Sequence, residues 1–598
     1  MKNLILTFLI LFSISIHSSA TNSKSDFHIR YNQVGYLLED QKIAVLFSDT
    51  KAPGKFIIYD KKKENKVFSG RCIPSTQDGW TRFKYFYKLD FTGLIVPGEY
   101  IIKVGDTETS SFRIGDDAYK GMQELLLDWM RQQRCGYNPF LDRICHQNDG
   151  RVYYSSISDS TFVDVSGGWH DAGDQLKYLI TGSNATARML LAYEWVSEVF
   201  EDRYNELGQP GGNGLADVLD EAKWGIDWIL KLHFKEDMLV HQVADDRDHR
   251  GWKWPHKDIS DYGWGENSYR AAYNANGKPQ GLGQYKSKAT GVSNVAGRSA
   301  AALAIASRIW EEQLGDKGHA EIFRKNAIEL YKMARENEGY QQGNSYGAPY
   351  RYNESTWKDD MEWAAAELYT ITKEDKYLKD AMEYGMDYGS TSWMIMDTAT
   401  HYEMYPFLHV GHFSLFENVN NEMQVKLKDF YREGIDYVIN KADKNIYGVG
   451  VPFIWCSNNL VAAYISQIIL YERMTGDKQY RNILTDHRDW LFGRNPWGTT
   501  MFTAIPEDGD YPVDIHTSVW YLTREEVPGG LVDGPLWKTI HSKLLGLELT
   551  QPDEFALFQN DYVVYHDDIG DYSTNEPTMD GTADAIFLIA WLAAGGRQ

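Results

Sequence analysis

The chain has 598 residues, more than one ordinary domain, so two or more hydrophobic cores are expected. Its formal net charge is −23 and no run of lysine or arginine interrupts the acidic background, which excludes nucleic acid as a partner and favours a neutral ligand over a polyanion. Aromatic residues make up 14% of the chain, with 19 Trp and 39 Tyr. Rings in such number suit a groove for sugars, whose apolar faces stack on aromatic planes, although a large aromatic core is the alternative.

The first twenty residues have the pattern of a signal peptide. Lys2 precedes an apolar run over residues 4–16, and residues 18–20 are small, as a cleavage site requires. No later segment has the apolar length that a membrane span needs. We therefore expect a soluble monomer that is secreted, either to the periplasm or out of the cell, with no membrane partner.

Residues 26–115 are predicted to form a small antiparallel β-sandwich domain. Alternating apolar runs are separated by turn residues such as Pro53-Gly54 and Pro97-Gly98, which is the spacing of short strands. The predicted strands cover residues 42–47, 55–59, 81–89, 99–104 and 110–114. This segment lacks the dense acidic clusters seen later, so a structural role is expected.

Residues 116–598 are predicted to form one helical domain with no further strand-rich block. After a helix that ends near Gly136, the periodicity predicts helices over residues 185–200, 215–233, 295–312, 320–336, 359–371, 422–439, 460–474, 480–492 and 583–592. Residues 368–377 and 470–480 resemble each other, each a helix end, a polar turn and a new helix start. Repeated helical hairpins indicate a barrel whose first and last helices are neighbours.

A dense group of functional residues lies ahead of the first of these long helices. Asp171 and Asp174 flank Gly173, whose missing Cβ lets the backbone turn so that both carboxylates can face one small target. Ionising two close carboxylates is unfavourable because their negative charges repel, so one is pushed toward acting as a proton acceptor near neutral pH. The alternative is that Asp174 only caps a helix beginning at Leu176.

A second acidic group, residues 567–577, precedes the final helix. It contains Asp571, Tyr572 and Glu576. Glycosidic cleavage needs an acid on one face of the bond and a base or nucleophile on the other, and a closed barrel brings Glu576 opposite Asp174. A solvated acidic loop is the alternative.

These motifs resemble glycoside hydrolase family 9, cellulases in which an immunoglobulin-like sandwich precedes an (α/α)6 barrel. Residues 32–36 are similar to the entry of the sandwich, residues 167–174 to the base motif and residues 571–576 to the acid motif. Supporting matches are residues 219–225, 362–366, 493–496 and 530–535. Two segments differ from the family pattern: residues 515–518 keep one histidine and lack an arginine, and residues 408–413 replace a segment rich in Trp and Asp.

The resemblance implies an inverting hydrolase of β-1,4-glucosidic bonds in cellulose-like or decorated β-glucans, an endoglucanase. Asp174 is then the general base, Asp171 helps to hold the water and Glu576 is the general acid. Trp169, His516 and Tyr572 are the expected substrate contacts. The partner is a neutral β-glucan polysaccharide or oligosaccharide.

Three other functions are considered. An exo-acting β-glucosidase or glucosaminidase of the same family would follow if an inserted loop such as residues 251–280 blocked one end of the groove. A sugar-binding protein without catalysis is a second alternative, against which the intact Asp171, Asp174 and Glu576 argue. A polysaccharide lyase would need a cationic site for uronates, which the acidic balance disfavours.

Two metal sites are also predicted. Cys135, Cys145, His146 and His170 lie within 36 positions and form a Cys2His2 set for structural zinc, as similarly placed residues do in some family members. A Cys135–Cys145 disulfide is the alternative in an exported protein.

Calcium is predicted at the start of the helix near residue 359. Ser355, Thr356, Asp359 and Asp360 offer oxygen ligands at a spacing similar to a calcium-binding stretch of some family members. The alternative is a helix N-terminus whose acidic residues favour the helix dipole.

Overall fold

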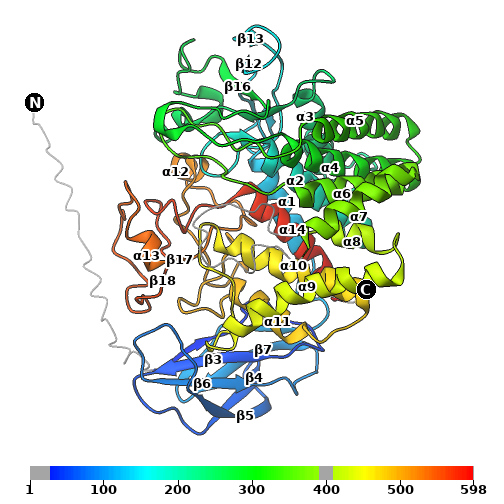
Figure 1. Ribbon diagram of the computed structural model, residues 1–598. Helices are drawn as coiled ribbons and strands as arrows, with labels where there is room; N and C mark the ends of the chain where they lie inside the picture. The colour runs from blue at the N-terminus through cyan, green and yellow to red at the C-terminus, as the bar shows by residue number, and fades with distance from the viewer. Residues whose placement is uncertain (1–26, 390–408, 597–598) are drawn as a thin grey trace, which may run out of the picture.

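The computed structural model describes residues 27–389 and 409–596. Figure 1 shows a β-sandwich, drawn in blue, packed beneath a larger helical domain. The predicted signal peptide lies outside the described residues. None of the helices in the described ranges is long and apolar enough to cross a membrane.

The sandwich is built from two sheets that share one long strand. β5 pairs with β4 through its first half and with β6 through its last four residues, so it passes from one sheet to the other. In β4 the side chains of Phe56 and Ile58 alternate with the exposed Lys55 and the half-buried Ile57 and Tyr59, and they are fully buried in a core of the sandwich's own. The strands are β1 (Phe27–Arg30), β2 (Gly35–Tyr36), β3 (Ile43–Ser48), β4 (Lys55–Asp60), β5 (Lys66–Ser75), β6 (Tyr85–Asp90), β7 (Gly98–Val104), β8 (Thr107–Glu108) and β9 (Phe112–Ile114).

The helical domain is a barrel of two concentric rings. Among the described residues, α2, α4, α6, α8, α10 and α14 each pack against the next, and α14 returns to α2 and closes the inner ring. The outer ring is formed by α1, α3, α5, α7, α9 and α11, each against an inner helix. α1 packs on α14, so the predicted contact between the first and last helices is confirmed.

Each predicted helix is present, with most ends shifted by a few residues, whereas α8, α12 and α13 lie outside the predicted ranges and α7 is indicated only by its start. The helices are α1 (Met122–Gln132), α2 (Leu179–Val196), α3 (Asp217–Leu232), α4 (Ser293–Glu312), α5 (Lys317–Glu336), α6 (Lys358–Thr372), α7 (Asp375–Tyr388), α8 (Gly411–Phe416), α9 (Asn421–Ala442), α10 (Ser457–Thr475), α11 (Arg481–Leu491), α12 (Ser518–Thr523), α13 (Lys538–His541) and α14 (Met579–Ala593).

The two rings differ in composition because they differ in burial. The inner helix α4 is rich in Ala, Ser and Gly and is buried on nearly every side, which lets neighbouring helices approach closely. The outer helix α5 buries one stripe, including Phe323, Ala327 and Leu330, and exposes the opposite face. The pattern of buried positions therefore decides which ring a helix joins.

A second sheet corrects the expectation that the barrel contains no strand-rich block. Five strands pair in the order β13-β12-β16-β15-β14 beside the start of α2. They are β12 (Asp149–Tyr153), β13 (Thr161–Phe162), β14 (Lys177–Tyr178), β15 (Val240–Val243) and β16 (Arg270–Asn274). β14 follows Asp174 almost directly, so the sheet fixes the end of the loop that carries the two aspartates. Two smaller pairs join β10 (Tyr137–Asn138) to β11 (Arg143–Ile144) and β17 (Leu536–Trp537) to β18 (Val563–Val564).

Buried polar contacts join the sandwich to the barrel at α11. Asn32 donates through Nδ2 to Asp489 Oδ1 at 2.8 Å, and the amide N–H of Gln33 donates to the carbonyl of Phe492 at 2.9 Å. Arg488 forms ion pairs with Asp489 and with Asp40 of the sandwich. These paired charges hold one orientation between the two parts of the chain.

Candidate active site

The acid motif and the base motif meet through one hydrogen bond. The backbone N–H of Gly173 donates to Glu576 Oε1 at 2.9 Å, although the two residues are 403 positions apart. Glu576 lies just ahead of α14, and Gly173 lies just ahead of β14 and α2. Closure of the inner ring between α14 and α2 brings the two motifs to one place.

Asp174 is held in an ionised state beside a histidine. Its Oδ1 accepts the backbone N–H of Leu176 at 2.7 Å, and its Oδ2 lies 3.5 Å from His249 Nε2. Burial alone would raise the pKa of Asp174, but the contact with His249 and the Leu176 N–H lower it below its usual value. α2 begins at Leu179 with Tyr178 as its N-cap, so Asp174 does not cap that helix.

The pKa of Glu576 is shifted in the opposite direction to that of Asp174. Burial, and then the negative charges of Asp533 and Asp174, raise the pKa of Glu576 well above its usual value. Its main chain is fixed by the N–H of Asp533, which donates to the carbonyl of Glu576 at 2.9 Å. The site therefore pairs a protonated carboxyl with an ionised one near neutral pH.

Asp171 is oriented by two hydroxyl groups. Thr181 Oγ1 donates to Asp171 Oδ1 and Tyr352 Oη donates to Asp171 Oδ2, each at 3.0 Å. Burial and the nearby charges of Asp174 and Asp580 raise the pKa of Asp171 well above its usual value. Asp171 is thus fixed in position and resists ionisation, whereas Asp174 keeps its charge.

These three carboxyl groups line one cavity of about 250 Å³. Aromatic side chains make up much of its wall, as a site for sugar rings requires. The lining residues are Asp171, Ala172, Asp174, Tyr178, His249, Tyr350, Arg351, Tyr352, Trp455, Cys456, His516, Asp533, Tyr572, Glu576 and Thr578.

Gly173 is required for a reason other than the expected turn. A Cβ at this position would lie 2.1 Å from the carbonyl oxygen of His516 and 2.7 Å from Glu576 Oε1. The glycine therefore permits close approach of the acid and the base loops, and its φ angle is not in the left-handed region.

Of the three expected substrate contacts, the structure places two at the cavity. His516 and Tyr572 line it, with ring centroids 6.1 Å apart. Trp252, from the segment 251–280, stands edge-on to His516 with centroids 4.7 Å apart and adds to the wall of the adjoining pocket. That segment thus borders the site, as expected for a loop that limits the groove.

Trp169 is a correction, because its indole belongs to the core and does not line the cavity. It is 1% exposed, and its Nε1 donates to Glu221 Oε1 at 2.7 Å. Arg134 forms a buried ion pair with the same carboxylate, Nη2 to Oε2 at 2.7 Å. Glu221 thereby ties the loop before Asp171 to the end of α1.

Comparison with known proteins agrees with this geometry. The model of the family described as glycosyl hydrolase family 9 matches residues 119–589, and that of the cellulase N-terminal Ig-like domain matches residues 24–109. The chain belongs to glycosyl hydrolase family 9. The predicted family and the predicted fold, a β-sandwich followed by an (α/α)6 barrel, are both confirmed.

Several known proteins resemble the chain along most of its length. Endoglucanase C of Cellulomonas fimi is 25% identical over 95% of this chain and 52% of that protein, so the chain spans about half the length of this relative. Endoglucanase D of Acetivibrio thermocellus is 24% identical over 87% of this chain and 80% of that protein. A solved structure titled as a zinc-binding triple mutant of the family 9 endoglucanase J30 is 25% identical, with a TM-score of 0.75 over 93% of this chain and 99% of that one.

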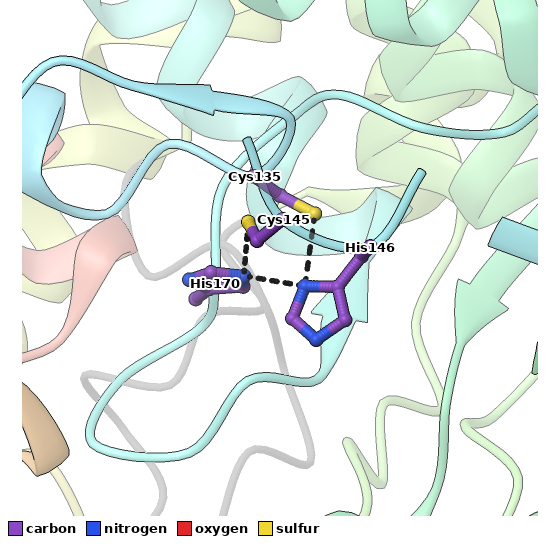
Figure 2. A group of neighbouring side chains, drawn as sticks. All are labelled: Cys135, Cys145, His146 and His170. Atoms are coloured by element: carbon purple, nitrogen blue, oxygen red, sulfur yellow. Dashed lines mark hydrogen bonds between the residues drawn. The ribbon is translucent and has the colours of Figure 1, made fainter. Parts of the chain in front are cut away.

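The predicted cysteine and histidine ligands of this family 9 chain converge on one point (Figure 2). The ligand atoms of Cys135, Cys145, His146 and His170 all lie within 4.8 Å of one another, and all four residues are buried. His146 Nδ1 lies 3.5 Å from Cys135 Sγ and 3.3 Å from His170 Nε2. Both thiols are free, so the structure contains no Cys135–Cys145 disulfide.

The surroundings of the cluster also suit a metal. His146 Nε2 points to Asp258 Oδ2 at 3.4 Å, which leaves Nδ1 for a metal and matches the carboxylate–histidine pairs found around zinc. Asp258 is itself paired with Lys253 at 2.8 Å. The set therefore fits a closed tetrahedral zinc site.

The predicted calcium ligands also have unsatisfied oxygens. Thr356 Oγ1, Asp359 Oδ1 and Asp360 Oδ2 are buried and have no hydrogen-bond partner among residues 27–389 and 409–596. Arg298 pairs with Asp360 at 2.7 Å and with Glu354 at 2.8 Å, which leaves more negative than positive charge. Burial, and then Glu354, raise the pKa of Asp359 to about 7. Hard oxygen atoms with excess negative charge fit calcium.

Some functional residues escaped the sequence reasoning. His249, Tyr352 and Asp533 reach the cavity from three separate segments, and only Asp533 lies in a motif that the sequence singled out. His249 stands in an Asp-rich stretch, residues 245–249, whose density of charge was the one available signal.

Proposed function

We propose that the protein is an inverting hydrolase of β-1,4-glucosidic bonds, acting within chains of a neutral β-glucan. The observation that carries the proposal is the hydrogen bond from Gly173 N–H to Glu576 Oε1, which sets a protonated acid beside the loop of an ionised base. An inverting site keeps its two carboxyl groups about 6.5–9.5 Å apart so that a water molecule fits between base and sugar.

Each carboxyl group then has one task. Glu576 donates its proton to the glycosidic oxygen as the bond to the anomeric carbon breaks. Asp174 accepts a proton from the water that attacks this carbon from the opposite face, so the product has inverted configuration. Asp171, fixed by Thr181 and Tyr352, orients that water. At the end Asp174 carries a proton and Glu576 has lost one, and exchange with solvent restores both.

The substrate class follows from the wall of the cavity and from the charge of the chain. Tyr350, Trp455 and Tyr572 offer apolar faces to sugar rings, and the net charge of −23 disfavours an anionic polymer. Both curated relatives compared above are named endoglucanases, which supports internal cleavage.

The test is product analysis from a screen of β-glucans, xyloglucan and chitosan fragments. We expect a spread of oligosaccharide lengths and, by proton NMR, the α-anomer as the first product. Single sugars released from one end would favour the exo-acting β-glucosidase or glucosaminidase, in which the segment 251–280 closes the groove. A first product in the β-configuration would contradict inversion.

Substitution of the acid and the base separates an enzyme from a sugar-binding protein. Glu576→Gln and Asp174→Asn should each lower turnover by roughly 10²–10⁴ because acid or base catalysis is lost. Binding of an oligosaccharide should persist in both variants, as measured by calorimetry. Equal and negligible turnover in the wild type and both variants would support a protein that binds sugar without cleaving it.

We further propose a structural zinc ion on Cys135, Cys145, His146 and His170. His170 adjoins Asp171, so the metal would restrict the loop that carries the base. Elemental analysis of protein purified without added metal should find zinc in the wild type and less zinc in the Cys145→Ser variant. The variant should also have a lower melting temperature. Absence of zinc together with oxidised Cys135 and Cys145 would overturn this assignment.

Calcium is proposed on the oxygens of Ser355, Thr356, Asp359 and Asp360. Chelation should lower the melting temperature and calcium should restore it, since a ligand that binds only the folded state stabilises it. The variant Asp359→Asn should lose most of this response. An unchanged melting temperature on chelation and add-back would argue against the site.

Export remains a proposal that rests on residues 1–20. Mass spectrometry of protein expressed from the whole sequence should find a mature chain that begins close to residue 21. Retention of Lys2 in the mature protein would contradict cleavage.

A further inference from the structure

A second cluster of histidine and carboxylate side chains lies apart from the catalytic cavity and from the Cys2His2 set. Glu362 projects from the inner helix α6, His409 lies two residues before α8, and His412 belongs to α8. All three are buried, and their ligand atoms lie within 4.8 Å of one another. None of them lines the catalytic cavity, so the mechanism does not use them.

The ring of His412 is fixed in one direction. Its Nε2 lies 3.0 Å from the carbonyl oxygen of Gly389, and because a carbonyl only accepts, this nitrogen carries a proton. The other nitrogen, Nδ1, faces Glu362 Oε1 at 2.7 Å. Metal-ligating histidines commonly donate their outer N–H to a backbone carbonyl in this way, which leaves the other nitrogen, here Nδ1 beside Glu362, as the one that would bind the metal.

The ring of His409 is also held in place, yet neither of its nitrogens has a hydrogen bond within the described residues. Tyr388 stacks on it, with centroids 4.9 Å apart and planes at 13°, and Gln467 accepts its backbone N–H at 3.0 Å. Its Nδ1 and Nε2 and the Glu362 Oε2 atom are all buried without a hydrogen bond in the described residues. The contact between Nε2 and Oε2 is 3.3 Å.

Glycines make room for the carboxylate. A Cβ at Gly385 would lie 2.5 Å from Glu362 Oε1, and a Cβ at Gly411 would lie 2.9 Å from Glu362 Oε2. These two positions, on α7 and α8, therefore leave space on both sides of one charged group. The Glu362 carboxylate therefore lies in a space between α6, α7 and α8 that the two glycines keep open.

A simple ion pair between protonated His412 and Glu362 accounts for only part of this arrangement. It explains the 2.7 Å contact but leaves both His409 nitrogens and Glu362 Oε2 unsatisfied in the interior. One cation placed among the three side chains would bind one nitrogen of His409, one nitrogen of His412 and the carboxylate of Glu362 together.

We propose that Glu362, His409 and His412 bind a divalent transition-metal ion, with zinc the best fit. Two imidazoles and one carboxylate are a ligand set that zinc accepts with a fourth position for water or another group. Tetrahedral ligands at about 2.1 Å from zinc lie about 3.4 Å apart, close to the His409–Glu362 contact. The ion would join α6 to α8 within the inner ring.

This proposal is independent of the glycosidase assignment, and its ligand chemistry separates it from the other two metal sites. The cysteine-containing set binds through thiolates, and the calcium set binds through oxygen alone. Cobalt(II) serves as the probe, because thiolate ligands give it intense near-ultraviolet charge-transfer absorption that nitrogen and oxygen ligands do not.

The experiment titrates cobalt(II) into full-length, metal-stripped protein in buffer that contains calcium to fill the oxygen site. We expect two cobalt equivalents in the wild type. His412→Gln and Glu362→Gln should each bind one and keep the thiolate absorption. The matched control, Cys135→Ser with Cys145→Ser, should also bind one but without that absorption.

Each outcome gives a decision even if a variant fails to fold. Wild-type protein that binds one cobalt with thiolate absorption would overturn the proposal and leave an ion pair. Wild-type protein that binds one cobalt without that absorption, and loses it in Glu362→Gln, would support this site while removing the Cys2His2 zinc. Circular dichroism identifies any variant that is unfolded, and the wild-type stoichiometry then decides.

Discussion

Replacing His249 by asparagine tests how the site keeps Asp174, the proposed base, ionised. The two charges of His249 and Asp174 are separated by 3.5 Å. Such a pair interacts by roughly 1.2 kcal/mol in bulk water and roughly 5 kcal/mol at an effective dielectric constant of about 20. One pKa unit corresponds to about 1.4 kcal/mol, so the loss of His249 should raise the pKa of Asp174 by about 1 to 3.5 units.

Partial exposure of both side chains to solvent places the expected pKa shift of Asp174 in the lower part of that range. The His249 side chain is 34% exposed and Asp174 is 13% exposed, so solvent screens the pair in part. We expect the acidic limb of the kcat/KM profile to move up by about 1–2 pH units, since this limb reports the base of the free enzyme. His249 also lowers the pKa of Glu576, so the alkaline limb should move the same way.

The assay is kcat/KM on a soluble cello-oligosaccharide from acidic to alkaline pH. His319→Asn is the matched control, because His319 forms a similar pair with Asp316, 2.6 Å away, on the surface at the start of α5. Its profile should match that of the wild type. An acidic limb that stays in its wild-type position in His249→Asn would refute the electrostatic role of His249.

Three further predictions use other measurements. Burial lowers the pKa of His249, but interaction with Asp174 raises it to about 9, so the stability that His249 adds is complete below pH 6.5 and is lost as pH rises through 9. The unfolding free energies of wild type and His249→Asn, measured with denaturant, should therefore become equal near pH 9. A difference between them that stays constant with pH would contradict this. Gly173→Ala should lower kcat by roughly 10² or more because it displaces Glu576, whereas wild-type turnover would show that the loops move apart freely. Arg134→Leu should cost roughly 3–5 kcal/mol of unfolding free energy because the buried Glu221 loses its direct ion-pair partner and keeps only the Trp169 N–H and the more distant Arg131 at 3.9 Å, and the exposed control Arg143→Leu should cost little.

The parts of the site that could be predicted from sequence are those carried by short motifs. Asp171 and Asp174 lie in one loop, and Glu576 lies in another, so their chemistry can be read from a few neighbouring residues. Their meeting depends on ring closure, which helical periodicity and the repeated hairpins indicated. The cavity gathers all three.

The rest of the site depends on contacts that no local pattern encodes. An indole beside a catalytic loop looks the same in sequence whether it faces a sugar or the core, and the partner that buries Trp169 is Glu221, 52 residues away. His249 and Tyr352 reach the cavity through the folded positions of their segments. Only the three-dimensional arrangement identifies them.

The missed sheet has a similar cause. β13 and β14 have two residues each, too few for an alternating pattern to emerge. β12 pairs in parallel with β16, more than a hundred positions along the chain. Strands of this kind are stabilised by their partners, so their sequences alone give little signal.

The hydrogen bond between Gly173 and Glu576 also has a consequence for folding during synthesis, because it joins an early and a late part of the chain. A ribosome adds roughly 5–20 residues per second, so roughly 20–80 s separate the synthesis of these two positions. During that interval the aspartate loop exists without its acid, and α2 lacks α14 as a neighbour. A chain cut short before Glu576 therefore contains many of the aromatic rings of the cavity but lacks its proposed acid, so under the proposed mechanism activity depends on the last part of the chain to be made.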